Sequence, residues 1–437
     1  MKTAATPSRA GSQEVSLDVV LPFYLYAAIF LLLSCVMLIF STQSFRGHHF
    51  QPDLLGITHA MALGWGTMMI LGASYQLIPV LVESRLRSFW LARGSFLLAA
   101  IGIPFLVYGF YSFHLGWVSQ VGAVAINLAV ILYIANLAWS VAQSKSDNIH
   151  AIFMLTASCW LLVTTLLGLV LLLNFTMDLL PQDSLHYLST HAHSGIVGWF
   201  LLLVIGVGSR LIPMFLISKY TNDGLLWGVY LLVNVGLLWL MAIELNPSLS
   251  GWQGLSLLFI GGGIVLFSVY TSQAYKKRIR RKVDAPIKLS LASVVMFLIP
   301  LVIIGVVIAG PEVARQELVN AYGFCVFFGW LTALILGMTF KTLPFIVWSK
   351  AYGHRSGKQR HPDPKDLFDH RVYRYSMWLY IIGFVGFLSG ILTGIDVLLT
   401  YPAALMILSA LLYVWNVLKV VFHKTIKYDK PIGTQSR

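Results

Sequence analysis

A pattern of glycine, tryptophan and proline occurs three times in this chain. In each copy a Gly-Trp pair is followed by a second glycine eight residues after the first, and by a proline seven residues later. The copies are Gly64-Trp65, Gly72 and Pro79; Gly198-Trp199, Gly206 and Pro213; and Gly329-Trp330, Gly337 and Pro344. Identical spacing in all three copies indicates an internal triplication, in which each repeat is one structural unit.

Long apolar stretches accompany the repeats and define the class of protein. Charged residues make up 11% of the chain, against about 25% in soluble domains, and about 20 apolar residues cross a bilayer. We predict an all-α integral membrane protein, a single polytopic domain (1–437) whose twelve transmembrane helices form three pseudo-threefold-related four-helix arcs. The predicted spans are 19–41, 53–82, 92–111, 115–142, 150–174, 187–217, 225–244, 251–275, 288–309, 318–348, 375–394 and 397–422, and the repeats are approximately 19–142, 150–275 and 288–422.

Basic residues gather in the loops at one end of the predicted bundle. They lie at 85–93, at 276–282, in the 350–374 loop and in the tail from Lys424. The positive-inside rule therefore predicts a bacterial cytoplasmic (inner) membrane protein with both termini in the cytoplasm. The net charge of +13 is explained by this topology and by attraction to the anionic lipid of the bilayer. Basic residues scattered over short loops argue against nucleic acid as a partner.

Histidines mark one level of the repeated helices. Twenty residues before the prolines stand His59 in the first copy, His193 in the second and Phe324 in the third. At 1.5 Å per residue this distance is roughly 30 Å, the hydrocarbon thickness, so the histidines are predicted one or two turns below the outer surface. A histidine inside a span is either hydrogen-bonded to a neighbouring helix or functional. Two at equivalent positions are candidates for the axial ligands of a haem, or for a metal site.

Two further histidines precede His193 on the same predicted helix. His191 points about 200° away from His193, so the two rings are expected to serve neighbouring cavities, or one is a ligand and the other is not. His186 lies seven residues before His193 and returns to the same face, so it is a candidate to cover the outer mouth of the site, or else a wet interfacial histidine. For copper in place of haem, the candidate ligands are His59, His191, His193 and His186.

A polar residue stands three positions before each repeated proline. These residues are Gln76, Arg210 and Lys341. One interpretation is that they snorkel to lipid phosphates. The other is that they line a positively charged inner vestibule for an anion such as a haem propionate, a quinone head group or a transported solute.

Twelve spans in three arcs, with histidines in the second and sixth, resemble subunit I of the haem-copper oxidases and the related NnrS-type membrane proteins. The motifs that carry the resemblance are His59-Ala60-Met61-Ala62-Leu63-Gly64-Trp65 and His191-Ala192-His193. The resemblance implies bound haem, in the form of haem b, with His59 at the position of the haem ligand of the second span. It also implies a role in respiratory electron transfer or the nitric oxide response. It also implies respiratory-chain or other membrane subunits as partners.

The chain departs from the oxidase pattern at two spans. Span ten carries Asn320, Tyr322 and Phe324 where the resemblance leads us to expect a histidine pair, and span seven contains no histidine. Oxygen reduction by the haem-copper mechanism is therefore not expected, although an oxidoreductase remains possible. Two other functions stay open at this point. One is a cofactor-free assembly or scaffold subunit, and the other is a transporter that uses the basic inner vestibule.

Overall fold

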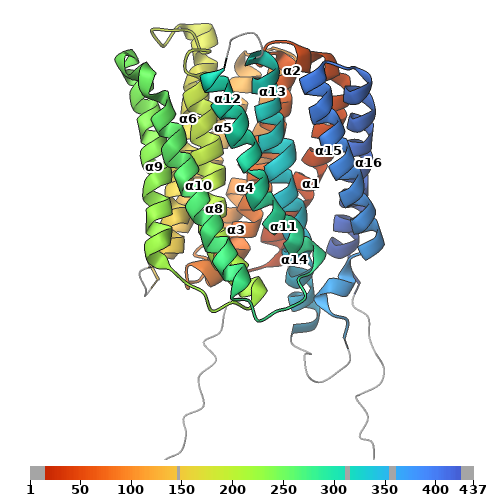
Figure 1. Ribbon diagram of the computed structural model, residues 1–437. Coiled ribbons are helices and arrows are strands. Elements are labelled where there is room, and N and C mark those ends of the chain that lie inside the picture. The colour runs from red at the N-terminus through yellow and green to blue at the C-terminus, as the bar shows by residue number, and fades with distance from the viewer. Residues whose placement is uncertain (1–14, 145–147, 311–314, 354–360, 425–437) are drawn as a thin grey trace, which may run out of the picture.

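The computed structural model describes residues 15–144, 148–310, 315–353 and 361–424, which form one bundle of long, roughly upright helices (Figure 1). Among these residues twelve helical segments are long and apolar enough to cross a membrane, and no β-strand is present. The prediction of an all-α protein with twelve spans is therefore confirmed. Part of the predicted basic 350–374 loop, and the tail after Lys424, lie outside the described residues.

The helices fall into three successive groups. The first repeat contains α1 (Leu17–Phe40), α2 (Pro52–His59), α3 (Met68–Leu81), α4 (Phe89–Tyr111) and α5 (Trp117–Val141). The second contains α6 (Ile149–Met177), α7 (Leu188–His193), α8 (Leu202–Leu216), α9 (Asp223–Leu245) and α10 (Gln253–Lys276). The third contains α11 (Ala285–Met296), α12 (Leu298–Ala309), α13 (Arg315–Phe324), α14 (Thr332–Tyr352), α15 (His370–Thr393) and α16 (Val397–Val421). Short 3₁₀ turns lie at Thr42–Arg46, Pro247–Trp252 and Pro364–Leu367.

The second span of each repeat contains a π-helical segment at its Gly-Trp pair. These segments are Ala60–Thr67, Ser194–Leu201 and Cys325–Leu331, and each begins four residues before the glycine of the pair. They join α2 to α3, α7 to α8 and α13 to α14 without a break. A π-helical turn accommodates an extra residue, and such turns are frequent at functional sites. We call the bundle end that carries α2, α7 and α13 the histidine end, and the opposite end the proline end.

The second glycine of each repeat brings the second span against the first helix of its own repeat. A Cβ atom on Gly72 would lie 2.5 Å from Cβ of Phe23 in α1, and one on Gly206 would lie 2.3 Å from Cβ of Phe153 in α6. A Cβ on Gly337 would lie 2.6 Å from a backbone oxygen of α11. These distances leave no room for a side chain, so the glycines permit close helix approach.

The third repeat departs from this arrangement at the histidine end. Gly64 faces α1 and Gly198 faces α6, but Gly329 faces Phe384 of α15 rather than the first helix of its own repeat. This helix is interrupted at Phe297, where α11 ends and α12 begins. Pro300 is the only residue of α12 that is buried, although Leu298, Leu301 and Ile303 pack against the core. The upper half of the ninth span is therefore less buried than the first helices of the other two repeats.

The three tryptophans are fully buried, and two of them connect different repeats. Trp65 Nε1 donates to Thr332 Oγ1 at 3.1 Å, and Trp199 Nε1 donates to Thr67 Oγ1 at 3.0 Å. Thr67 and Thr332 each stand two residues after their own tryptophan, and the equivalent position in the second repeat is Leu201. The first repeat thus bonds to the third and the second to the first, in a layer that crosses the middle of the bundle.

Candidate functional site

A cavity of about 870 Å³ lies at the histidine end, bounded by the second spans of all three repeats. The four histidines that the sequence singles out, His59, His186, His191 and His193, all line it. Trp199 belongs to the same lining, as does Thr67, its hydrogen-bond partner. The cavity volume lies within the roughly 300–1,000 Å³ typical of small-molecule and cofactor sites.

Hydrogen bonds to backbone carbonyls fix the tautomer of three of these histidines. Nδ1 of His59 and Nδ1 of His193 each lie 2.8 Å from the carbonyl oxygen four residues earlier in the chain. Nδ1 of His191 lies 3.1 Å from the carbonyl oxygen of Thr164 in α6. Because a carbonyl only accepts, each Nδ1 carries the proton, and each Nε2 of the neutral ring keeps its lone pair. No Nε2 atom of these three rings has a hydrogen-bond partner among the described residues.

His59 and His191 form a pair within the cavity. Their ring centroids are 6.2 Å apart and their planes differ by 22°. The His59 ring also stacks on Phe110 of α4 at 4.3 Å, which limits its rotation. Two metal–nitrogen bonds of about 2 Å place ligating nitrogens about 4 Å apart, and ring centres lie somewhat further apart than the nitrogens. The 6.2 Å between the ring centroids of His59 and His191 matches the distance between two rings that bind one metal ion from opposite sides.

The pairing differs from the sequence-based expectation, which joined His59 to His193. For His191 and His193 the sequence left two alternatives, neighbouring cavities or only one of the two as a ligand. Both line the same cavity, and His191 is the one beside His59. The bond to Thr164 of α6 holds the His191 ring on the side that faces α2. The His193 ring turns instead toward α13, where its centroid lies 5.8 Å from that of Tyr322.

A carboxylate without a spacing signal in the sequence completes one side of the cavity. Glu244, the penultimate residue of α9, has a side chain that lines the cavity. Glu244 Oε1 lies 3.0 Å from His186 Nε2, and Glu244 Oε2 accepts a hydrogen bond from Thr190 at 3.1 Å. No histidine, cysteine or second carboxylate lies within one helical turn of Glu244 in the sequence, so only the packing of α7 on α9 reveals it.

The loop before α2 adds one more imidazole to the lining. His49 lines the cavity and stacks on His48, with ring centroids 4.1 Å apart. Burial, and next the neighbouring imidazole of His48, lower the pKa of His49 below its ordinary value. His49 is therefore kept in its neutral form near neutral pH.

The third repeat fills the equivalent level with aromatic side chains. Phe324 stacks on Phe328, Phe384 and Phe387 at centroid distances of 5.1, 5.5 and 4.8 Å. One turn earlier, Asn320 donates to the carbonyls of the 45–47 loop at 3.0 and 2.9 Å. These two positions of span ten, where the resemblance leads us to expect histidines, have packing and loop-anchoring contacts instead.

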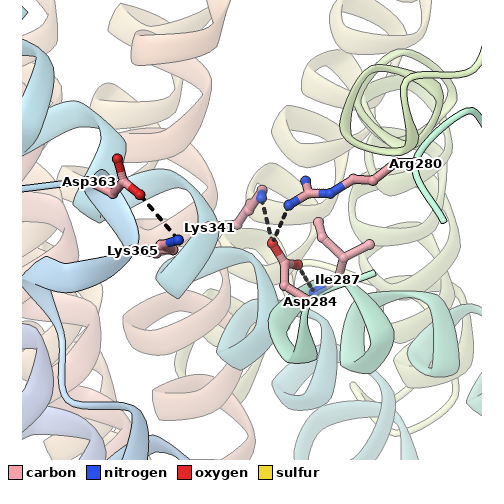
Figure 2. Close-up of polar contacts among 6 residues, drawn as sticks. All are labelled: Arg280, Asp284, Ile287, Lys341, Asp363 and Lys365. Atoms are coloured by element: carbon pink, nitrogen blue, oxygen red, sulfur yellow. Dashed lines mark hydrogen bonds and ion pairs between the residues drawn. The ribbon is translucent and has the colours of Figure 1, made fainter. Parts of the chain in front are cut away.

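Two of the three polar residues before the prolines form ion pairs. Lys341 Nζ lies 2.8 Å from Asp284 Oδ2, which also accepts from Arg280 at 3.5 Å (Figure 2). Figure 2 shows the side chain of Lys341 directed at this carboxylate, near a second ion pair between Asp363 and Lys365. Both cations of the predicted vestibule are paired, because Arg210 meets Glu83 at 3.4 Å. Gln76 Oε1 is buried without a partner among the described residues.

A second, smaller cavity lies between the proline-end halves of the same spans. Its volume is about 130 Å³ and its lining is almost entirely apolar. None of Gln76, Arg210 and Lys341 lines it, and its described lining contains no carboxylate or imidazole. The two cations at this level therefore have carboxylate partners, and the cavity at this end of the bundle is apolar.

The donor set of the larger cavity favours a centre with two protein ligands. Among the described residues no group of three or more His, Cys, Asp and Glu side chains is placed to hold a metal ion. A haem needs only axial ligands from the protein, because the porphyrin supplies the other four nitrogens. The chain matches no protein-family model and no curated protein sequence at a significant level. Its function is therefore argued from this site.

Proposed function

We propose that this chain is a haem-binding membrane protein in which His59 and His191 would hold the haem iron. The observation that carries the proposal is the paired arrangement of their rings, each with Nδ1 bonded to a backbone carbonyl and Nε2 free inside one cavity. Metal-ligating histidines have this second hydrogen bond almost always, because it fixes the tautomer and orients the ring. The 870 Å³ cavity is lined mainly by apolar side chains, as suits a macrocycle.

When bound, a haem would supply one-electron redox chemistry or binding of a diatomic gas. The residues of this chain would position it: Phe110 and Thr164 orient the two ligands, and aromatic side chains of span ten close the opposite side. The resemblance to haem-copper oxidase subunit I and to NnrS-type proteins supports respiratory electron transfer or the nitric oxide response as the setting. The oxidase's binuclear centre is not part of the proposal, because Asn320 and Phe324 have other contacts.

The test is to purify the protein in mild detergent from haem-replete cells and record its reduced-minus-oxidised visible spectrum with iron and copper analysis. We expect a b-type spectrum with one iron per chain, lost in His59→Ala and in His191→Ala. His150→Ala is the matched control, because His150 lies at the proline end, where its Nδ1 is 2.9 Å from Ser209 Oγ. A colourless protein with one copper per chain would show that the cofactor is copper and not haem. A well-folded protein with neither metal would refute the proposal and favour a scaffold.

We also propose that the proline end faces the cytoplasm in a bacterial inner membrane. The loops after spans two, eight and ten all lie at this end and carry basic residues, among them Arg85, Arg278 and Lys365. Alkaline phosphatase fused after Lys424 should be inactive, and a fusion within the 178–186 loop should be active. The reverse pattern would invert the topology without affecting the cavity.

A further inference from the structure

The segments that follow α8 and α10 are joined to each other at the proline end. Ile279 N donates a hydrogen bond to the carbonyl oxygen of Ile217 at 3.2 Å, and Ser218 and Arg278 form an antiparallel β-bridge. We call the two segments together the basic corner, residues 216–220 and 276–282. The corner directly follows two segments of membrane-spanning length and composition, so it lies at the membrane surface.

The basic corner carries positive charge that the protein does not neutralise. Elsewhere at the proline end cations meet carboxylates, as Arg210 meets Glu83. In the corner only Arg280 has such a partner among the described residues, because it lies 3.5 Å from Asp284 (Figure 2). The cations of the corner without a carboxylate partner in the described part of the chain are Lys219, Lys276, Lys277, Arg278, Arg281 and Lys282. Such a concentration of charge attracts an anion from outside the chain.

Two of these cations are held in place by tyrosine rings. Lys277 Nζ lies 4.8 Å from the ring centroid of Tyr220, on the other segment of the corner, and Arg278 Cζ lies 3.8 Å from that of Tyr275. Arg278 Nη1 also donates to the carbonyl oxygen of Tyr275 at 2.8 Å. An aromatic face orients a cation without cancelling its charge. Two consecutive cations beside the β-bridge are therefore oriented and uncompensated, and lysine and arginine are the usual side chains that bind phosphate.

Two exposed isoleucines lie among these cations. Ile217 and Ile279, whose backbones are joined by a hydrogen bond, are 55% and 62% exposed. Ile217 has φ of 52° and ψ of 50°, a left-handed conformation that a β-branched residue rarely adopts. Strained residues of this kind persist only where the surrounding structure holds them, and they gather at functional sites. Exposed apolar side chains beside cations at a membrane surface suit a phosphate that carries hydrocarbon chains better than a free anion in water.

We propose that the basic corner binds the head group of an anionic phospholipid. Arg278 and Lys277 hold its phosphate, and its acyl chains run past Ile217 and Ile279 toward α8 and α10. Neither segment of the corner contains a carboxylate, so the corner offers no partner to the ammonium group of a zwitterionic lipid. The corner therefore selects for a head group with net negative charge, such as phosphatidylglycerol. This site lies at the opposite end of the bundle from the histidines and does not depend on bound haem.

The test is titration of the delipidated full-length protein in mild detergent with phosphatidylglycerol, phosphatidylethanolamine or inorganic phosphate, read by native mass spectrometry. We expect phosphatidylglycerol to bind roughly tenfold more tightly than phosphatidylethanolamine, and excess inorganic phosphate not to displace it. Lys277→Gln combined with Arg278→Gln should weaken phosphatidylglycerol binding roughly tenfold or more, because each removes one cation from the anionic head group. Lys350→Gln combined with Lys365→Gln is the matched control, because it removes the same charge at the same end of the bundle.

Ile217→Asn tests the contact with the acyl chains. Asparagine adopts the left-handed conformation readily, so the corner should keep its shape while the lipid loses an apolar contact. We expect phosphatidylglycerol binding to weaken roughly threefold to fivefold, with the unfolding midpoint no lower than that of the wild type. Equal affinity for the two lipids, or equal losses in the double variant and its control, would overturn the inference. Displacement of the lipid by inorganic phosphate would overturn the assignment to a phospholipid.

Discussion

The third repeat differs from the first two at the histidine end and resembles them at the proline end. At the proline end all three second spans pack on the first helix of their repeat through Gly72, Gly206 and Gly337. At the histidine end the first two repeats contribute imidazoles to a cavity. The third repeat contributes Phe324 and the helix α12, of which only Pro300 is buried. One half of the molecule keeps the symmetry of the triplication and the other half departs from it.

The difference separates packing from chemistry. Close backbone contact at a glycine tolerates no side chain, so the second glycine is the same in every repeat. A binding cavity needs unlike walls, because a ligand must be held on one side and admitted on another. In this chain the second repeat supplies three of the five histidines that line the cavity, and the third repeat supplies α12, of which only Pro300 is buried.

Filling a glycine at the proline end should produce the largest effect. Gly206→Val introduces atoms where even a Cβ would lie 2.3 Å from Phe153 Cβ, and overpacking of this severity costs about 3 kcal/mol or more. We expect little folded protein by size-exclusion chromatography in detergent. Gly323→Ala is the control, because a Cβ there meets nothing within 4 Å. Equal yields of the two variants would show that the conserved half is not held by close packing.

Restoring the missing histidine should destabilise the third repeat. Phe324→His places an imidazole among Phe328, Phe384 and Phe387, and we expect a loss of roughly 3 kcal/mol of unfolding free energy. The measurement is denaturant unfolding in micelles, with Phe324→Leu as the apolar control, which should cost less. A variant as stable as wild type, with additional bound metal, would mean that the third repeat can still form a site of the first type.

Removing a hydroxyl of the tryptophan layer should have a moderate effect. Thr67→Val leaves the buried Trp199 Nε1 without its acceptor and should cost about 1–2 kcal/mol. Thr332→Val should do the same for Trp65. Leu201→Val, at the equivalent position of the second repeat, changes no hydrogen bond of the layer, and its unfolding midpoint should shift less. A larger shift for Leu201→Val would contradict the role assigned to these bonds.

Breaking the ion pair at the proline end should have the smallest effect. The side chains of Lys341 and Asp284 are 19% and 35% exposed, and partly exposed pairs contribute within about 1 kcal/mol. Lys341→Met should therefore bind haem as wild type does and shift the unfolding midpoint only slightly. A clear loss of haem in Lys341→Met would instead indicate that Lys341 contacts a haem propionate.

Much of the fold follows from the sequence, and less of the site does. Apolar stretches and the repeated Gly-Trp pattern predict twelve spans in three related groups, because both depend on local spacing. The spacing also identifies the level of His59 and His193. It cannot determine which histidine faces His59, because that depends on the bond between His191 and Thr164 of a neighbouring helix. Glu244 and the acidic partner of Lys341 were missed for the same reason, since each meets its partner only through tertiary packing.

The tryptophan layer divides the two cavities by the side chains they hold. Trp65 and Trp199, bonded to Thr332 and Thr67, lie between the histidine-lined cavity and the apolar cavity below it. Every imidazole in the described linings of these two cavities is on the histidine side of the layer. If the proposed haem is bound, its chemistry would therefore be held in one half of the bundle, nearer the membrane surface at the histidine end.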